Sequence, residues 1–266
     1  MVYPRLEPLP MWRLPAASLE GSHASPERTL QTTPLATTVR PYAPGDSMNR
    51  IHWKSTARHG DIQVKEFDLE QTADAWIILD LQRGIQAGRG EESTTEASIR
   101  AAASVADKAL GENRAVGMTV NAGRTAYLPA DRGGRQHQKV MQLLAAVDAD
   151  SSTPLVETLI ASVGRLRRGM TAVVITPSLD PSWVRPLAAL RTRGVACVVV
   201  TLDADAFAKH EAAARAEATG AAMPSNPEAE EAQAKRRRAL RHALAEYELR
   251  VHTIVPSRPL GEILAS

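Results

Sequence analysis

A short stretch of this sequence, RPYAPGDSMNRIHWKSTARHGDIQVKEF at residues 40–67, carries charged side chains of both signs at close spacing. Such a group can do two kinds of work. Arginine forks and carboxylates can pair with one another and tie neighbouring elements together. Alternatively, a basic face can bind an anion, a phosphate-bearing substrate or an acidic protein surface. Because charge runs are more often solvated or paired than functional, we favour the first interpretation and keep the second open.

A short predicted helix would position these charges. The Pro-Gly-Asp sequence at 44–46 predicts a turn, after which Asp46 or Ser47 can cap a helix that runs to about His59. Gly60 then supplies the stop signal of a helix C-terminus. One face of this helix would carry a basic stripe of residues spaced four apart: Arg50, Lys54 and Arg58.

We expect the stretch to act mainly as an intramolecular clasp. The residues after the helix, 61–67, alternate as in a β-strand. Trp53 should pack inward against the first core strand or its covering helices, as an aromatic anchor does. Paired and partly buried charges are expected at Arg40, Asp46, Arg58 and Glu66, because an unpaired buried charge is costly.

Other patterns that carry chemistry are weak. The seven histidines include no His-Glu-x-x-His pair, and Cys197 lies alone in the apolar run VACVVV, so neither a zinc site nor an internal disulfide is expected. The sequence GDIQVKE matches metal-dependent nucleases poorly. A basic helix start at 235–250 could touch nucleic acid, but the acidic run EAEEAQA just before it can neutralise it.

Composition bounds the class of protein. The chain has 266 residues, with 32 Lys and Arg against 30 Asp and Glu, a formal net charge of +2. This balance gives no general electrostatic case for binding nucleic acid or membrane. No apolar stretch approaches the roughly 20 residues that span a bilayer, and the start MVYPRLEPLPMW lacks a secretory pattern. We therefore expect a soluble, cytoplasmic protein with no nucleic-acid partner.

Apolar periodicity predicts an α/β domain over residues 75–258. Short apolar runs alternate with amphipathic helical patterns, which is typical of a mostly parallel sheet with helices on both faces. The predicted strands are AWIILDLQ, AVGMTVNAG, MTAVVITPS, VACVVVTLD and RVHTIVP, and RTAYLPA can join them as an edge hairpin strand. An Ala/Glu-rich segment at about 205–234 predicts a helical insertion with a flexible middle. Residues 1–74, rich in proline at the start, form a separate, partly β N-terminal module.

The 40–67 stretch, together with the following DAWIILD, resembles the signature of the domain-of-unknown-function family 58, DUF58. The family pattern reads R-x-Y-x-x-G-D-x-x-R-x-I-x-W-x-x-x-A-R. The residues that match are Arg40, Tyr42, Gly45, Asp46, Arg50, Ile51, Trp53, Lys54, Ala57, Arg58, Lys65 and Glu66. The resemblance covers essentially the whole chain.

This resemblance implies a Rossmann-like domain of the von Willebrand factor type A kind over residues 75–258. It also implies a partner, because family members are often encoded beside MoxR-type AAA+ ATPases and are thought to act with them as assembly factors. Many members carry transmembrane helices before this region, so the protein could act at the inner face of the membrane if such an anchor precedes this chain. The family has no established molecular activity.

Domains of the von Willebrand type can hold Mg²⁺ through an Asp-x-Ser-x-Ser motif after the first strand, at the switch point of the sheet. The corresponding residues here are Asp80, Gln82 and Gly84, so Asp80 alone survives and we expect a degenerate site without metal. With no cofactor expected, two functions remain. The first is a non-enzymatic interaction protein that works with an AAA+ ATPase. The second is an enzyme or binding module that acts on a phosphate-bearing or nucleic-acid substrate through the Arg50/Lys54/Arg58 face.

Overall fold

The structure is a computed structural model that describes residues 2–15, 38–43, 46, 48, 51–66, 74–219 and 227–265. The chain forms two compact units. The large unit comprises Met1–Leu19 and Thr72–Ser266, and the small unit comprises Glu20–Gln71. The small unit is therefore an insertion into the large one.

A six-stranded sheet forms the centre of the large unit. Its order is β5-β4-β3-β6-β7-β8, and all neighbours are parallel except β4 and β5. Every residue of β3, β4 and β6 is buried, because helices cover both faces, and this explains their continuous apolar runs. The five predicted core strands and the antiparallel edge strand are confirmed as β3 (Ala75–Asp80), β4 (Val116–Asn121), β5 (Ala126–Asp131), β6 (Thr171–Thr176), β7 (Ala196–Leu202) and β8 (Arg250–Ile254).

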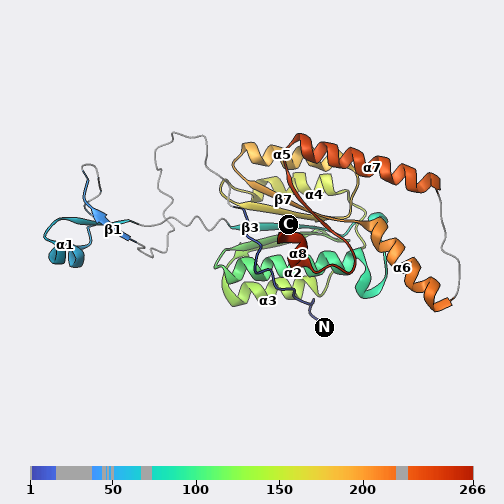
Figure 1. The fold of residues 1–266 in the computed structure, drawn as a ribbon, viewed down its shortest axis with the longest axis horizontal. Helices are drawn as coiled ribbons and strands as arrows, with labels where there is room; N and C mark the ends of the chain where they lie inside the picture. Colours follow the sequence, from blue (N-terminus) through green and yellow to red (C-terminus); the bar gives the residue numbers. More distant parts are fainter. Residues whose placement is uncertain are drawn as a thin grey trace. The chain divides into compact units, whose positions relative to one another are not determined.

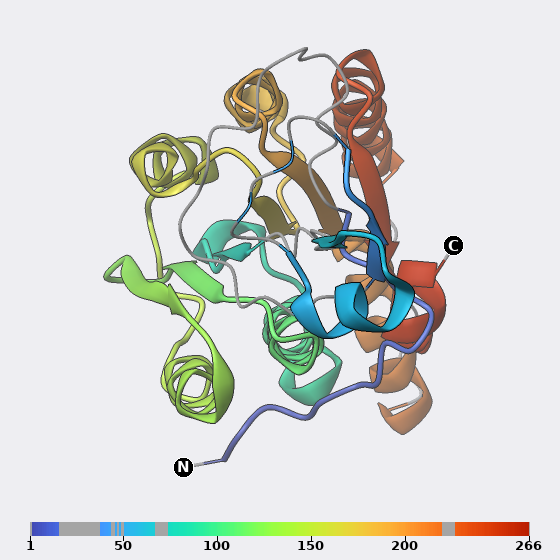
Figure 2. The same ribbon diagram turned by 90° about the vertical axis from the view of Figure 1, so that its left-hand side faces the viewer.

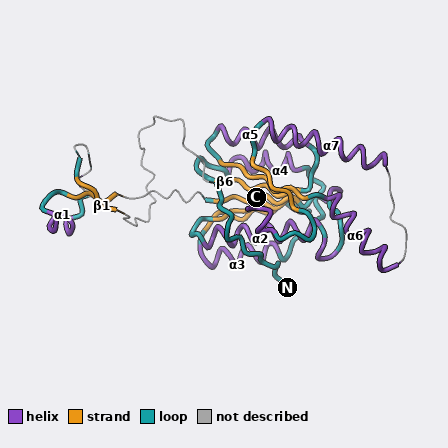
Figure 3. Tube along the Cα trace, in the orientation of Figure 1, coloured by secondary structure: helices purple, strands orange, loops and turns teal. Residues whose placement is uncertain are grey.

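Helices pack on both faces of this sheet, as the sequence predicts (Figures 1 and 3). One core lies under α2 (Thr94–Gly111), α3 (Gly133–Leu144) and α8 (Leu260–Ala265), and α8 was not predicted. The opposite core lies under α4 (Leu155–Ser162), α5 (Val184–Thr192) and α7 (Pro227–Glu246). Helix α6 (Ala204–Thr219) follows β7 and projects with the first half of α7 beyond the sheet (Figure 1).

The first 15 residues belong to the large unit, which differs from the predicted N-terminal module of residues 1–74. Their extended chain runs past α8 (Figure 2) and buries Leu9, Trp12 and Leu14 in the core shared with α2 and α8. Glu7 forms an ion pair with Arg100 at 3.1 Å. The prolines of this segment thus prevent regular structure but not packing.

Two segments of the large unit, one before and one after the small unit in the sequence, meet at one residue of β6. The Thr171 hydroxyl donates to the carbonyl oxygen of Pro15 at 2.6 Å. The N–H of the same residue donates to the carbonyl oxygen of Asp74 at 2.9 Å. Pro15 and Asp74 therefore lie side by side at the amino end of β6.

The small unit is a two-stranded antiparallel sheet with one short helix. Strand β1 (Thr38–Pro41) pairs with β2 (Gln63–Glu66), and α1 (Trp53–His59) lies between them in the sequence. Its buried side chains include Ile51 and Val64, which face each other through an isolated β-bridge. Within the described ranges of both units, no helix combines the length and apolarity that crossing a membrane requires.

Candidate functional site

The carboxyl ends of β3, β4 and β6 bring together the first polar cluster. Strand β3 lies between β4 on one side and β6 on the other, so the sheet reverses its direction of growth there. Open α/β sheets bind ligands at such a switch point. The last residue of β3 is Asp80, the residue that the sequence singles out, and it is fully buried.

Hydrogen bonds from the chain itself saturate the Asp80 carboxylate. The Thr176 hydroxyl donates to Oδ2 at 2.7 Å, the Asn121 amide donates to Oδ1 at 3.0 Å, and the Gln82 backbone N–H donates to Oδ1 at 3.2 Å. Burial raises the pKa of the Asp80 carboxyl above its ordinary value of 3.8, although these three hydrogen bonds act in the opposite direction. The group is therefore held in place rather than presented to a ligand.

Residues of the loop before α4 form further hydrogen bonds to this cluster. The Ser151 hydroxyl donates to the Asn121 side-chain oxygen at 2.7 Å, and the Asn121 amide also donates to the carbonyl oxygen of Thr153 at 2.9 Å. Gln82 and Ser151 form a parallel β-bridge, and both Asn121 and Ser151 are buried. Because Ser151 donates to an amide oxygen and not to a base, the pair lacks the relationship that activates a nucleophile.

The residues at the switch point do not fit a metal ion. A cation would meet the amide hydrogens of Asn121 and Gln82, which already point at the Asp80 carboxylate. The carboxylate of Asp180, the next candidate ligand, accepts hydrogen bonds from the backbone and the hydroxyl of Ser182. No group of three or more potential metal-ligating side chains occurs within the described ranges.

The clasp predicted for residues 40–66 is present in part. Arg40 and Asp46 form a two-pronged ion pair, with Nη2–Oδ1 at 2.7 Å and Nη1–Oδ2 at 2.8 Å. The same Asp46 carboxylate accepts a hydrogen bond from the backbone N–H of Ala43 at 2.8 Å. Asp46 thereby stabilises the turn after β1 instead of capping a helix.

The predicted helix begins later than expected. Its first residue is Trp53, because the backbone N–H of His52 donates to the carbonyl oxygen of Gln63 at 2.7 Å and holds residues 51–52 beside β2. Its end is as predicted, since Gly60 adopts a left-handed conformation with φ of 81°. Of the predicted basic stripe, Lys54 and Arg58 lie on the helix. Gly45 and Arg50 lie outside the described residues, as do the side chains of Lys65 and Glu66.

Two residues of this block are exposed within the small unit. Arg58 is exposed and makes no ion pair with any described residue. Trp53 exposes 68% of its surface and is not an anchor inside its own unit. Five large apolar residues of this unit expose between 37% and 68% of their surface: Val39, Tyr42, Met48, Trp53 and Ile62.

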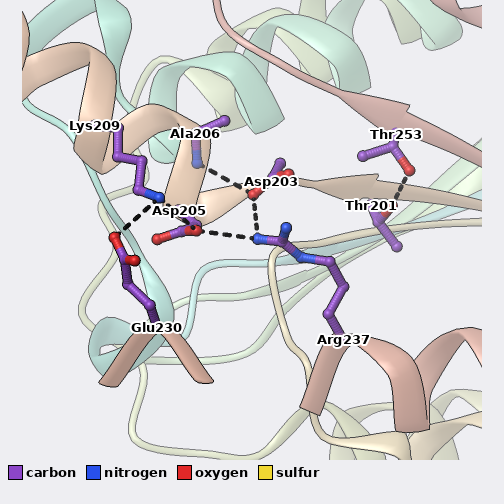
Figure 4. Close-up of polar contacts among 8 residues, drawn as sticks. All are labelled: Thr201, Asp203, Asp205, Ala206, Lys209, Glu230, Arg237 and Thr253. Carbon is purple, nitrogen blue, oxygen red and sulfur yellow. Dashed lines mark hydrogen bonds and ion pairs between the residues drawn. The ribbon is translucent and has the colours of Figure 1, made fainter. Parts of the chain in front are cut away.

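A chain of ion pairs joins α6 to α7 beyond β7 (Figure 4). Arg237 of α7 contacts Asp203 at 2.8 Å and Asp205 at 3.4 Å. Lys209 of α6 contacts Asp205 at 3.7 Å and Glu230 at 3.1 Å, and the hydrogen bond that Lys209 donates to Glu230 is the largest cause that raises the pKa of Lys209. Asp203 also caps α6, because its carboxylate accepts from the backbone N–H of Ala206. The basic run at residues 235–238, which lies inside α7, is thus partly paired within the fold through Arg237.

A known protein family shares the part of the chain that contains these residues. A family model described as "Protein of unknown function DUF58" matches residues 38–246. This chain belongs to the DUF58 family. The matched range includes the 40–66 block and the Asp80 cluster of this DUF58 protein, so both are parts of the family domain.

Among curated relatives, the DUF58 protein is similar to the uncharacterized protein Rv1480 of Mycobacterium tuberculosis, with 29% identity over 171 residues, 62% of this chain and 53% of the relative. It is also similar to the uncharacterized protein YeaD of Bacillus subtilis, with 23% identity over 121 residues, 46% of this chain and 28% of the relative. The matches thus span about half or less of each relative's length. A likeness to proximal thread matrix protein 1 from the mussel byssus, with 10% identity over 49% of this chain and 37% of that one, has a TM-score of 0.37 and carries no argument.

Proposed function

We propose that this DUF58 protein is a non-enzymatic interaction factor whose small unit binds a protein partner. The observation that carries the proposal is Trp53, which is 68% exposed on α1 next to the exposed cations Lys54 and Arg58. Aromatic and basic side chains dominate the energetics of protein interfaces. Exposed apolar patches larger than those of ordinary surfaces mark such interfaces as well.

The Asp80 cluster supports a non-enzymatic role. The switch point is the usual ligand site of this architecture, and here the loop containing Ser151 covers it. Three donors from the chain occupy the Asp80 carboxylate, and the nearby Ser151 hydroxyl faces an amide. The hydrogen bonds of this cluster therefore hold the ends of β3, β4 and β6 together, which is a structural role.

The proposal extends to the kind of fold and the partner. We infer that the large unit is von Willebrand factor type A-like, since Asp80 ends the first core strand and an antiparallel edge strand, β5, follows the second. The DUF58 resemblance points to a MoxR-type AAA+ ATPase as the partner, in the cytoplasm or at the inner face of the membrane. An acidic surface on this ATPase would complement Lys54 and Arg58.

A binding measurement with purified ATPase tests this function. The full chain, Trp53→Ala and Lys54→Ala/Arg58→Ala would be titrated by calorimetry at two salt concentrations. Loss of an aromatic hot spot costs about 2 kcal/mol or more, so Trp53→Ala should weaken binding by roughly thirtyfold or more. The double variant should bind more weakly mainly at low salt, because surface charges act through screened electrostatics.

Matched controls lie on the large unit. Ile160→Ala removes an exposed apolar side chain of α4, and Arg185→Ala removes an exposed cation of α5. Both should bind like the unchanged protein. Binding that tolerates Trp53→Ala and the double variant would contradict the proposed surface. Competition by inorganic phosphate at millimolar concentration would instead favour the phosphate-binding alternative.

A further inference from the structure

Strand β8 ends the sheet, and its outer hydrogen-bonding edge has no backbone partner among the described residues. The backbone N–H of Asp203 donates to the carbonyl oxygen of Ile254 at 2.9 Å, so Ile254 directs its backbone groups to β7. In a parallel pair the orientation alternates, and Val251 and Thr253 therefore direct their N–H and C=O groups away from β7. Among the described residues no backbone group pairs with this outer edge.

The opposite edge of the sheet is protected and β8 is not. Strand β5 contains Pro129, which cannot donate to a further strand, and its pairing with β4 contains an irregularity. Proline and bulges are devices that prevent strand addition at sheet edges. The five residues of β8 include neither, and three of them are β-branched: Val251, Thr253 and Ile254.

A groove of about 420 Å³ runs along this edge. Its lining comes from the N-terminal segment, β8 and α8: Met11, Trp12, Arg13, Arg250, Val251, His252, Leu264 and Ala265. Met11 is 78% exposed and Val251 is 36% exposed, so the groove offers apolar contacts. The two charged side chains in the lining, Arg13 and Arg250, are both basic and exposed.

Two buried ring nitrogens in the groove wall, Trp12 Nε1 and His252 Nε2, have no hydrogen-bond partner in the part of the chain that the structure describes. His252 Nδ1 lies 3.2 Å from the carbonyl oxygen of Ile263, which can only accept, so Nδ1 carries the proton. Burial lowers the pKa of His252, and Nε2 of the neutral ring is an acceptor. The groove wall therefore contains one donor, Trp12 Nε1, and one acceptor, His252 Nε2, without a partner among the described residues.

We propose that an extended, acidic peptide segment of a protein partner adds to the outer edge of β8 as a seventh strand. Its backbone pairs with Val251 and Thr253, and its carboxylates lie against Arg13 and Arg250. Strand addition of this type takes its affinity from main-chain hydrogen bonds and its specificity from the alternating side chains. A second copy of this chain fits less well, because β8 itself carries no acidic side chain to face Arg13 and Arg250.

The test uses the full chain and a short capped peptide that alternates valine and aspartate, labelled with fluorescein, in an anisotropy titration. A second peptide carries N-methyl groups on alternate backbone amides, and a third replaces aspartate with lysine. Val251→Pro removes an outward N–H and leaves the β7 pairing intact, because Val251 does not bond to β7. Arg13→Glu reverses an exposed charge of the groove, and Arg185→Glu on α5 is the matched control.

We expect the acidic peptide to bind, and Val251→Pro and N-methylation each to weaken binding by about tenfold, the effect of one lost hydrogen bond. Arg13→Glu and the lysine peptide should also each lower the affinity by about tenfold. Arg185→Glu should change nothing. No binding of the acidic peptide at millimolar concentration, or equal binding of the N-methylated or lysine peptide, would overturn the proposal. Unchanged binding by both Val251→Pro and Arg13→Glu would do so too. A concentration-dependent dimer that Val251→Pro dissociates would assign the edge to a second copy.

Discussion

The hydroxyl of Thr171 donates a 2.6 Å hydrogen bond to the carbonyl oxygen of Pro15, 156 residues earlier in the chain. The same residue binds the Asp74 carbonyl oxygen through its backbone. One buried threonine at the start of β6 thus binds two segments of the large unit that are far apart in the sequence.

Replacing Thr171 with valine should destabilise the large unit. The change keeps the side-chain volume and leaves the Pro15 carbonyl oxygen without its donor, which costs about 1–2 kcal/mol for a buried group. Thr192→Val is the matched control, because the exposed Thr192 hydroxyl donates to Ala189 in contact with water. Urea denaturation should show a lower unfolding free energy for Thr171→Val alone. Equal curves for the two variants would show that the Pro15 contact contributes nothing.

The raised pKa of Asp80 predicts a pH dependence of stability. Its carboxyl keeps its proton to a higher pH in the folded protein than in the unfolded chain, because burial disfavours the charge. The unfolding free energy should therefore fall as pH rises from 3.8 through the folded-state pKa. Asp80→Asn removes the titrating group and should lack this component. Denaturation curves measured across this range would reject the assignment if both proteins responded identically to pH.

Magnesium ions should leave the melting temperature unchanged. The Asp80 carboxylate accepts hydrogen bonds from Asn121, Thr176 and the Gln82 backbone, so a cation would have to displace its donors. A ligand present at about 100 times its dissociation constant would add roughly 2.7 kcal/mol, which a thermal melt detects easily. Sodium chloride at matched ionic strength is the control. A rise with millimolar Mg²⁺ that Asp80→Asn abolishes would establish a metal site.

Asp46 and Arg58 should differ in their effects on the small unit. Asp46→Ala removes the ion pair with Arg40 and the hydrogen bond from the Ala43 N–H. The Asp46 side chain is 19% exposed and the Arg40 side chain is 40% exposed. We expect a loss of about 1 kcal/mol, because partial exposure weakens the pair. Arg58→Ala should be nearly neutral, since its side chain is exposed. Amide exchange of Tyr42 and His52 would report both effects within the small unit.

The control for this pair of variants is Asp61→Ala. Asp61 is exposed and makes no contact with a described side chain, so its removal tests the loss of a carboxylate without the loss of a pair. Faster amide exchange in Asp61→Ala than in Asp46→Ala would argue against the Arg40–Asp46 clasp.

Arg237 should stabilise the attachment of α7 to α6. Arg237→Ala removes the contacts to Asp203 and Asp205 and leaves two acidic groups near each other, which should cost about 1 kcal/mol at low salt. Arg236→Ala, an exposed neighbour on α7, should be neutral. Amide exchange in α6 should become faster in the Arg237 variant, and high salt should reduce the difference. Identical exchange in the two variants would mean that the ion pairs of Figure 4 do not hold α6.

The position of α1 shows where sequence reasoning reaches its limit. Asp46 and Ser47 are good helix caps, and a helix starting there satisfies every local signal. The structure starts the helix at Trp53, because residues 51–52 pair with 63–64 of β2. A long-range backbone pairing outweighs a local propensity worth about 1 kcal/mol. Gly60 was predictable, since a left-handed helix end depends on the glycine alone.

Apolar periodicity in the sequence predicts the sheet of the large unit, most of its flanking helices and the position of Asp80 at the end of β3, because strands buried on both faces must be apolar throughout. The hydrogen bonds of Asn121 and Thr176 to Asp80, the bond of Ser151 to Asn121, and the packing of Trp12 and Leu14 in the large unit's core are visible in the folded structure alone. Hydrogen-bond partners and packing partners far apart in the chain depend on strand register and loop paths, which no local pattern of residues records.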